Sequence, residues 1–204
     1  EQTGSPLNIV VNDDGLNIFA GNRLYAFYEQ AKALPAGQRT REQEEVVQRL
    51  DFYRSHGIGF VARPMPVAGV AHTQRAGRFK KASNMNFGVR LHKQAQQSSL
   101  EETLSMPAYR YAAAEGDIAV NDYIILLDKD SYIPAGAIEQ TIPEFIANPL
   151  LAYTQHRTEP TNADETHFAG VVAGFTNNLY AVTFKTRAML GFNVPFVGHN
   201  AILR

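Results

Sequence analysis

The fold predicted for this chain depends most on one segment, Tyr123-Ile-Ile-Leu-Leu-Asp128-Lys129-Asp130-Ser131. Its five large residues, from Tyr123 to Leu127, predict a strand that is buried on both faces. Two carboxylates one residue apart follow this strand, and Pro134 is placed to begin a helix. Ligands of open α/β sheets bind at the carboxyl ends of the strands. The acidic pair therefore predicts a site for a divalent cation, because hard cations prefer carboxylate oxygens.

Two other interpretations of this acidic pair compete with the metal site. An Asp pair after a strand often forms only a turn and the N-cap of the next helix. A calcium loop is also suggested, since Asp128, Asp130 and Glu139 fall at loop positions one, three and twelve. However, Ile133 occupies position six, where the sharp turn of such a loop requires glycine.

The composition excludes several classes of protein. The chain has 204 residues, 19 basic and 20 acidic, so its near-zero net charge gives no reason to expect a nucleic-acid partner. It contains no cysteine, which excludes a disulfide framework and thiolate chemistry. No apolar run approaches the roughly 20 residues of a membrane span, and no signal peptide opens the sequence. We therefore expect this segment itself to be soluble.

The apolar pattern along the rest of the chain predicts an α/β fold with a mostly parallel sheet flanked by helices. Strands are expected at Leu7–Val11, Ile58–Ala62, Tyr123–Leu127 and Leu151–Gln155. Helices are expected over residues 24–33 and 41–55, from residue 82 onward, from Ser98 or Ser99 to about 114, and after Pro134 with an interruption at Pro143. The mixed stretch 168–190 could form one long helix.

Basic residues are concentrated in one region. No Asp or Glu occurs between Asp51 and Glu101, whereas this interval contains Arg54, Arg63, Arg75, Arg78, Lys80, Lys81, Arg90 and Lys93. Such a patch indicates a phosphate-bearing ligand, although a solvated basic loop is the simpler alternative. The predicted helix after Lys81 strengthens the first interpretation, because a helix N-terminus beside cations favours anions.

Five motifs in a fixed order carry a resemblance to a known family. They are Asn12-Asp13-Asp14-Gly15, Arg75-Ala-Gly-Arg78-Phe-Lys80-Lys81-Ala-Ser-Asn84-Met-Asn86, Leu127-Asp128-Lys129-Asp130-Ser131, Gln155, and Gly198-His199-Asn200-Ala-Ile-Leu-Arg204. In this order they resemble family-2 glycosyltransferases, in particular the membrane-bound polysaccharide synthases such as cellulose synthase and the osmoregulated periplasmic glucan glucosyltransferases. The resemblance implies a nucleotide-diphospho-sugar transferase fold of GT-A type, with residues 1–204 as one catalytic domain, incomplete at both ends.

The resemblance also implies a role for each motif in an inverting transfer from a UDP-sugar to a carbohydrate or lipid-linked acceptor. Asp13 and Asp14 match the acids that contact uracil and ribose, Lys81 and Asn84 match residues near the diphosphate, and Asp128 also belongs to the nucleotide-binding set. Asp128 and Asp130 match the DxD pair that holds Mn²⁺ or Mg²⁺, with Asp130 as the more direct ligand. Gly198, His199 and Asn200 match the segment on the acceptor side, although a histidine in an apolar stretch is more often only a hydrogen-bonded core residue.

The sequence departs from the family pattern at both ends. In the family a first strand and its helix precede the acidic motif, whereas only a short segment precedes Asp13 here. The family's general base and its Gln-x-x-Arg-Trp motif come later than Arg204, and this chain has no Trp. We therefore expect the base beyond Arg204, in a parent protein that is membrane-embedded and has this segment at the cytoplasmic face.

The main alternative to an enzyme is a homologue that binds nucleotide or metal without turnover. A Rossmann dehydrogenase is excluded, because no Gly-x-Gly-x-x-Gly follows the first predicted strand.

Overall fold

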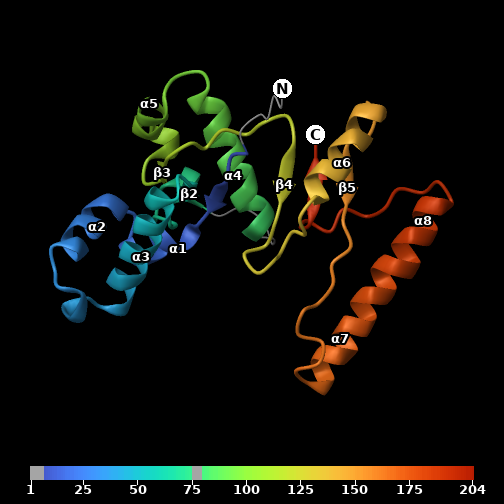
Figure 1. Ribbon diagram of the computed structural model, residues 1–204. Coiled ribbons are helices and arrows are strands. Elements are labelled where there is room, and N and C mark those ends of the chain that lie inside the picture. Colours follow the sequence, from blue (N-terminus) through green and yellow to red (C-terminus); the bar gives the residue numbers. More distant parts are fainter. Residues whose placement is uncertain (1–6, 75–79) are drawn as a thin grey trace. The chain divides into compact units, whose positions relative to one another are not determined.

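The computed structural model describes residues 7–74 and 80–204, which form parts of two compact units, Glu1–Val120 and Asn121–Arg204. The positions of these units relative to one another are not determined (Figure 1). The single catalytic domain expected over residues 1–204 stays a prediction.

A three-stranded sheet forms the centre of the first unit. Its order is β1 (Val10–Asn12), β2 (Gly59–Ala62) and β3 (Ala113–Glu115), with β1 parallel to β2 and β3 antiparallel to β2. The predicted strands at 7–11 and 58–62 are confirmed to within a few residues. Every residue of β2 is buried, as expected for the central strand of a covered sheet.

Successive side chains of β2 point to opposite faces of the sheet, and helices pack against both faces. Phe60 and Ala62 pack with the apolar residues of α1 (Asp14–Ala20), α2 (Leu24–Lys32) and α3 (Arg41–Ser55). Val61 points the other way and packs with Leu91 of α4 (Lys80–Ala95) and the apolar residues of α5 (Leu100–Ser105). Figure 1 shows these two groups of helices on opposite sides of the sheet.

The described part of the first unit also contains short 3₁₀ turns at η1 (Ala36–Gln38), η2 (Ala71–Thr73) and η3 (Pro107–Tyr109). The helix predicted to run to about residue 114 is wrong beyond Ser105. Ser99 does cap α5, accepting a hydrogen bond from the Glu102 N–H at 3.0 Å. Pro107 then cannot donate a backbone hydrogen bond to continue the helix, and the chain turns through η3 into β3.

The second unit also contains a three-stranded sheet, but its topology differs from the prediction. The order is β4 (Ile124–Leu126), β6 (Ala201–Leu203) and β5 (Tyr153–Gln155), and β6 is antiparallel to both neighbours. Of the four strand pairs that the structure describes, only β1–β2 is parallel, so these strands do not form the mostly parallel sheet that we expected.

The strand predicted at Tyr123–Leu127 is present, but its predicted burial on both faces is wrong for this unit. β4 is an edge strand of the sheet, its residues are half-buried, and Leu127 is exposed. The central position belongs to β6, where Ala201 and Ile202 are buried. A run of large apolar residues does not by itself distinguish these two positions.

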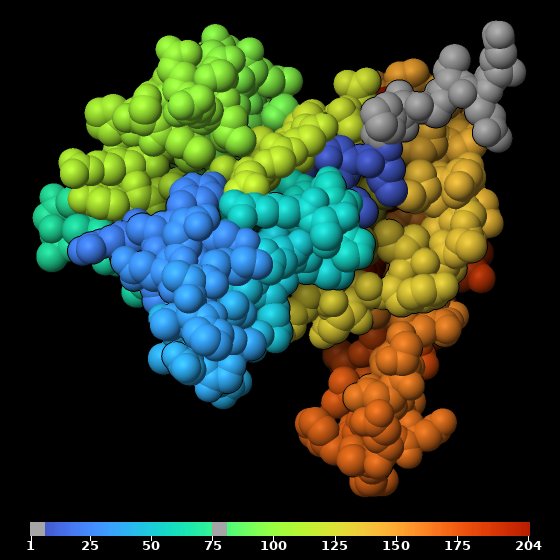
Figure 2. Space-filling view, turned by 60° about the vertical axis from the view of Figure 1, so that its left-hand side comes forward, coloured from blue at the N-terminus to red at the C-terminus, as the bar shows by residue number. Residues whose placement is uncertain are grey.

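One long helix dominates the rest of the second unit. α7 (His167–Asn178), the π-helical η4 (Leu179–Phe184) and α8 (Lys185–Met189) follow one another without a break, which confirms the helix predicted over 168–190. It packs through Ala173, Tyr180 and Phe184, while Phe168 and Phe175 are exposed. In the space-filling view, the orange surface of α7 stands out from the yellow part of the same unit (Figure 2).

The remaining helix, α6 (Ala137–Ala147), begins later than predicted. Gly136 is its N-cap, with a positive φ of 80°, so Pro134 lies before the helix rather than at its first position. The predicted interruption at Pro143 is also wrong. The helix continues through Pro143, although proline has no backbone N–H to donate and its ring clashes with the preceding turn.

Candidate functional site

A pocket of about 1190 Å³ in the second unit collects residues from three chain segments that meet at one edge of the sheet. β4 and β5 are both antiparallel to β6, so they run in the same direction and their carboxyl ends lie where β6 begins. Asp128 and Asp130 follow β4, His156 and Thr158 follow β5, and His199 and Asn200 precede β6. All six line the pocket.

Four of the residues that the sequence predicted as site residues therefore lie together: Asp128, Asp130, His199 and Asn200. Gly198 belongs to the same turn, where its φ of 85° favours glycine, but it does not line the pocket. The structure thus brings the expected metal-binding acids next to the segment expected on the acceptor side.

The side chain of Gln155 holds this turn. Its amide nitrogen donates to the carbonyl oxygens of His199 and Asn200, at 2.9 and 3.2 Å, and its amide oxygen accepts from the Val197 N–H at 3.1 Å. The backbone N–H of His156 donates to the same Asn200 carbonyl at 2.9 Å. The backbone around His199 is therefore fixed from the β5 side of the sheet.

Asn200 adds a second connection to the strand end. Its φ is 50°, a left-handed conformation that Asn tolerates better than most residues. Its side-chain nitrogen donates to the Thr158 hydroxyl at 2.9 Å, and that hydroxyl lies 3.4 Å from the hydroxyl of Tyr180. The turn, the segment after β5 and η4 thus form one hydrogen-bonded wall.

The imidazole of His199 faces Asp128 without forming a hydrogen bond. Its Nδ1 lies 3.9 Å from Asp128 Oδ2, which is longer than a hydrogen bond. This nitrogen is buried, and within the described parts of the chain it has no hydrogen-bond partner. A buried polar atom without such a partner is rare, and a bound water molecule or ion is one way to satisfy it.

The residues present fit a divalent cation that shares its coordination with a substrate. In the described ranges, 7–74 and 80–204, no group of three or more His, Cys, Asp or Glu side chains forms a complete protein cage for a metal. Cations of the Mg²⁺ type need only one or two protein ligands when phosphate oxygens and water supply the others. Asp128, with Asp130 in the same pocket, meets this requirement.

Among the pocket residues that were not predicted as site residues are three with basic or acidic side chains, His156, Arg157 and Glu159. They directly follow β5, so the rule that ligands bind at strand ends could have identified them. Burial lowers the pKa of His156. Glu159 pairs with Arg157 at 3.2 Å and is largely exposed, and it brings an acid to the pocket from the loop after β5.

In the first unit, Asp13 is held by several partners. It caps α1 by accepting from the Gly15 N–H at 3.0 Å, and its carboxylate also accepts from Arg49 at 3.2 Å and from the Tyr53 hydroxyl at 2.9 Å. Burial, followed by the charge of Asp13, raises the pKa of Tyr53. The turn-and-cap interpretation that was weighed for Asp128 and Asp130 therefore describes part of what Asp13 does.

Asp14 pairs with a buried arginine. The Nε of Arg63 lies 3.0 Å from Asp14 Oδ1, its terminal nitrogens add a contact to Oδ2 and a 2.8 Å hydrogen bond to Ser83, and Arg63 is only 4% exposed. Asn84 donates to the Asn12 carbonyl at 3.2 Å, which attaches α4 to the end of β1. Lys81 lies exposed in the first turn of α4, which begins at Lys80 and not after Lys81 as expected.

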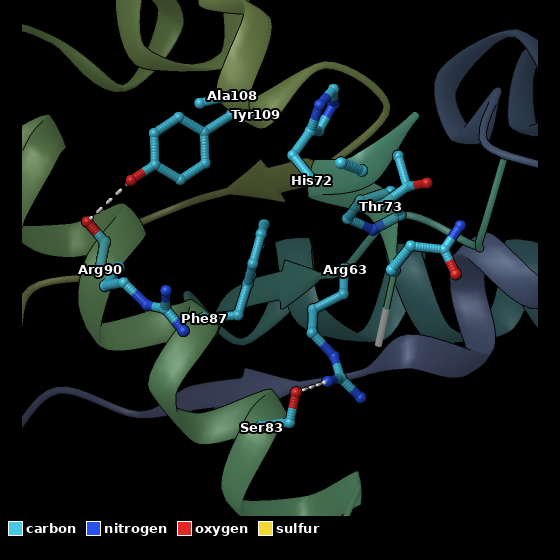
Figure 3. A pocket seen from close by; sticks show the side chains of 11 residues that line it. Arg63, His72, Thr73, Ser83, Phe87, Arg90, Ala108 and Tyr109 are labelled. Carbon is cyan, nitrogen blue, oxygen red and sulfur yellow. Dashed lines mark hydrogen bonds between the residues drawn. The ribbon is translucent and has the colours of Figure 1, made fainter. Parts of the chain in front are cut away.

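A second pocket, of about 340 Å³, lies beside this arginine (Figure 3). Arg63, His72, Phe87, Arg90 and Tyr109 line it, so part of the predicted basic patch forms a wall that also contains aromatic rings. Figure 3 shows the bonds that tie this wall together, from Arg63 to Ser83 and from the Tyr109 hydroxyl to the Arg90 carbonyl. Arg75 and Arg78 also belong to the predicted basic patch, and they lie outside the described residues.

The predicted residues thus divide between the two units. Asp13, Asp14, Lys81 and Asn84 belong to the first, and Asp128, Asp130 and the 198–200 turn belong to the second. A single cleft that contains both sets stays a prediction, since the relative position of the units is not determined.

The second unit is also the part of the chain that matches a protein-family model. Residues 123–204, less than half of the chain, match the model described as glycosyl transferase family group 2. This match supports a family-2 glycosyltransferase and glycosyl transfer in general. Neither the curated proteins nor the solved structures contain a match to the chain. Among the helices of the described residues, none combines the length and the apolar character needed to cross a bilayer.

Proposed function

We propose that this chain forms the donor-binding part of an inverting glycosyltransferase that uses a UDP-sugar and Mn²⁺ or Mg²⁺. One observation carries the proposal: the family-2 match covers the segment in which Asp128, Asp130, His199 and Asn200 line one pocket. A nucleotide-diphospho-sugar transferase fold of GT-A type is part of the same proposal.

The residue types suit the chemistry of this reaction. When the anomeric bond breaks, negative charge develops on the departing diphosphate, and a divalent cation bound there stabilises that charge. Asp128 and Asp130 supply oxygen ligands from the end of β4. Apolar residues, among them Ile125, Ile138 and Ile202, line the same pocket.

The first unit is proposed to contribute the nucleoside contacts. Asp13 and Asp14 would meet uracil and ribose, and Lys81 and Asn84 would lie near the diphosphate. Because the carboxylates of Asp13 and Asp14 already accept hydrogen bonds from Arg49, Tyr53 and Arg63, their orientation is set before a ligand arrives. Such preorganisation lowers the entropic cost of binding.

The acceptor and the cellular setting follow from the resemblance. We propose a carbohydrate or lipid-linked acceptor on the side of Gly198, His199 and Asn200, and polysaccharide or glucan synthesis by a parent protein at the cytoplasmic face of a membrane. The general base beyond Arg204 stays a prediction. Glu159 is the first residue to test against it, since it lies in the pocket.

Calorimetric titration of the chain with UDP, with and without Mn²⁺, tests the proposal. We expect binding that requires the metal and that weakens roughly 10- to 100-fold in Asp130→Ala, the usual cost of disturbing a metal site. Asp164→Asn is the matched control, because Asp164 is an exposed acid of the same unit outside the pocket lining. UDP binding that does not require Mn²⁺ and is not weakened by Asp130→Ala would contradict the proposed site.

A further inference from the structure

The gap between His199 and Asp128 has the dimensions of a shared metal ion. Two ligands that each lie about 2.1 Å from one cation are separated by roughly 3.0 Å at a right angle and by about 4.2 Å when opposite. The observed separation of 3.9 Å between His199 Nδ1 and Asp128 Oδ2 falls inside that interval. It is too long for a direct hydrogen bond.

The nitrogen that faces the gap is the one that needs a partner. His199 Nδ1 is buried and makes no hydrogen bond within the described residues, although the imidazole as a whole is 30% exposed. A neutral imidazole with its proton on Nε2 presents a lone pair at Nδ1, which is the form that ligates metals.

The backbone that carries this imidazole is held before any ion binds. Gln155 holds the backbone on both sides of His199 through the Val197 N–H and the His199 and Asn200 carbonyls. Asn200 is in turn tied to Thr158. Metal sites are more precise when the backbone that carries their ligands is held in place, and the backbone of this turn is held by these hydrogen bonds.

We propose that His199 is a ligand of the divalent cation, pairing its Nδ1 with the carboxylate of Asp128, in addition to the acceptor-side position proposed for the 198–200 turn. The inference rests on the proposed function only for the presence of a cation in this pocket. It adds a specificity, because imidazole nitrogen binds Mn²⁺ and later transition metals better than Mg²⁺, which prefers oxygen ligands. The site is therefore selective for Mn²⁺ over Mg²⁺.

The test uses Mn²⁺ alone as the probe and measures pulsed electron paramagnetic resonance of the bound ion. Directly coordinated imidazole gives a ¹⁴N modulation, which we expect in the unchanged chain and expect to lose in His199→Gln. We also expect His199→Gln to weaken Mn²⁺ binding roughly 10- to 100-fold and to affect Mg²⁺ binding less. Circular dichroism of each variant checks that it is folded.

His156→Gln is the matched control, because His156 lines the same pocket but its Nε2 lies near the hydroxyls of Thr141 and Thr154, at 3.5 and 3.4 Å. It should keep the ¹⁴N modulation. A modulation that persists in His199→Gln, its absence in the unchanged chain, or a failure of Mn²⁺ to bind would each overturn the inference.

A parallel titration with UDP and Mn²⁺ separates this inference from the proposed function. UDP binding that requires Mn²⁺ but shows no ¹⁴N coupling refutes His199 as a ligand and leaves the proposed function standing. A ¹⁴N coupling without any UDP binding supports His199 as a ligand and refutes the proposed function.

Discussion

Replacing Gln155 by leucine should destabilise the second unit by removing the side chain that holds the 197–200 turn. The amide has two hydrogens for its backbone acceptors, and its oxygen accepts from Val197, so the substitution removes at most three hydrogen bonds. At about 1 kcal/mol each, the loss is about 3 kcal/mol, and water that reaches this half-buried position reduces it to about 1.5–3 kcal/mol.

Urea unfolding followed by circular dichroism measures this change, a suitable signal because the chain has no Trp. Amide signals of residues 197–200 in nuclear magnetic resonance spectra should shift or broaden in the Gln155→Leu variant. Gln140→Leu is the control, because Gln140 is exposed on α6 and its substitution should change stability by no more than about 0.5 kcal/mol. An unchanged unfolding midpoint together with unchanged 197–200 signals would refute the role of Gln155.

Three other predictions concern the first unit. Asp14→Asn removes the charge that faces the buried guanidinium of Arg63, so we expect a loss of roughly 3–5 kcal/mol in urea unfolding, and a loss below 1 kcal/mol would contradict the pairing. Gly59→Ala brings a Cβ against the backbone carbonyl of Asp117, so we expect about 1–3 kcal/mol of destabilisation or more, and a variant of normal stability would disprove the close contact. Burial lowers the pKa of His92. The neutral imidazole therefore contributes stability above the unfolded pKa of about 6.5, and this contribution is lost as pH falls through the folded pKa. The unfolding midpoint, measured across this pH range, should depend less steeply on pH in His92→Gln than in the unchanged chain.

Helix and strand positions were predictable where local signals were strong. Thr40 and Gln43 form a capping box at the start of α3, and its apolar stripe of Val46, Val47 and Leu50 is buried as the spacing requires. The long helix over 167–189 was also predictable. A helix tolerates isolated glycines when its other residues pack against the rest of the unit.

Sheet topology was less predictable, because it depends on pairing between distant segments. Nothing local in Ala201-Ile202-Leu203 shows that this strand lies between β4 and β5. The apolar run of β4 predicted a central position, whereas β6 occupies that position with Ala201 and Ile202 buried. A long apolar run predicts that a strand is buried, but it does not identify the strand or helix that packs against it.

The convergence of Asp128, Asp130, His199 and Asn200 on one pocket could be predicted despite this error, and the reason is geometric. The strand-end rule requires only that β4 and β5 run in the same direction, and two strands antiparallel to a shared neighbour satisfy that condition as well as a parallel pair does. Leu126 and Gln155 both stand opposite Ala201, so the residues after β4, the residues after β5 and the turn before β6 must converge. The antiparallel β6 contributes what a parallel strand could not, since it enters the sheet at this edge and brings His199 and Asn200 to the acids. A register shift of β6 would move these two residues away from Asp128, so the pairing of β6 sets the chemistry of the pocket.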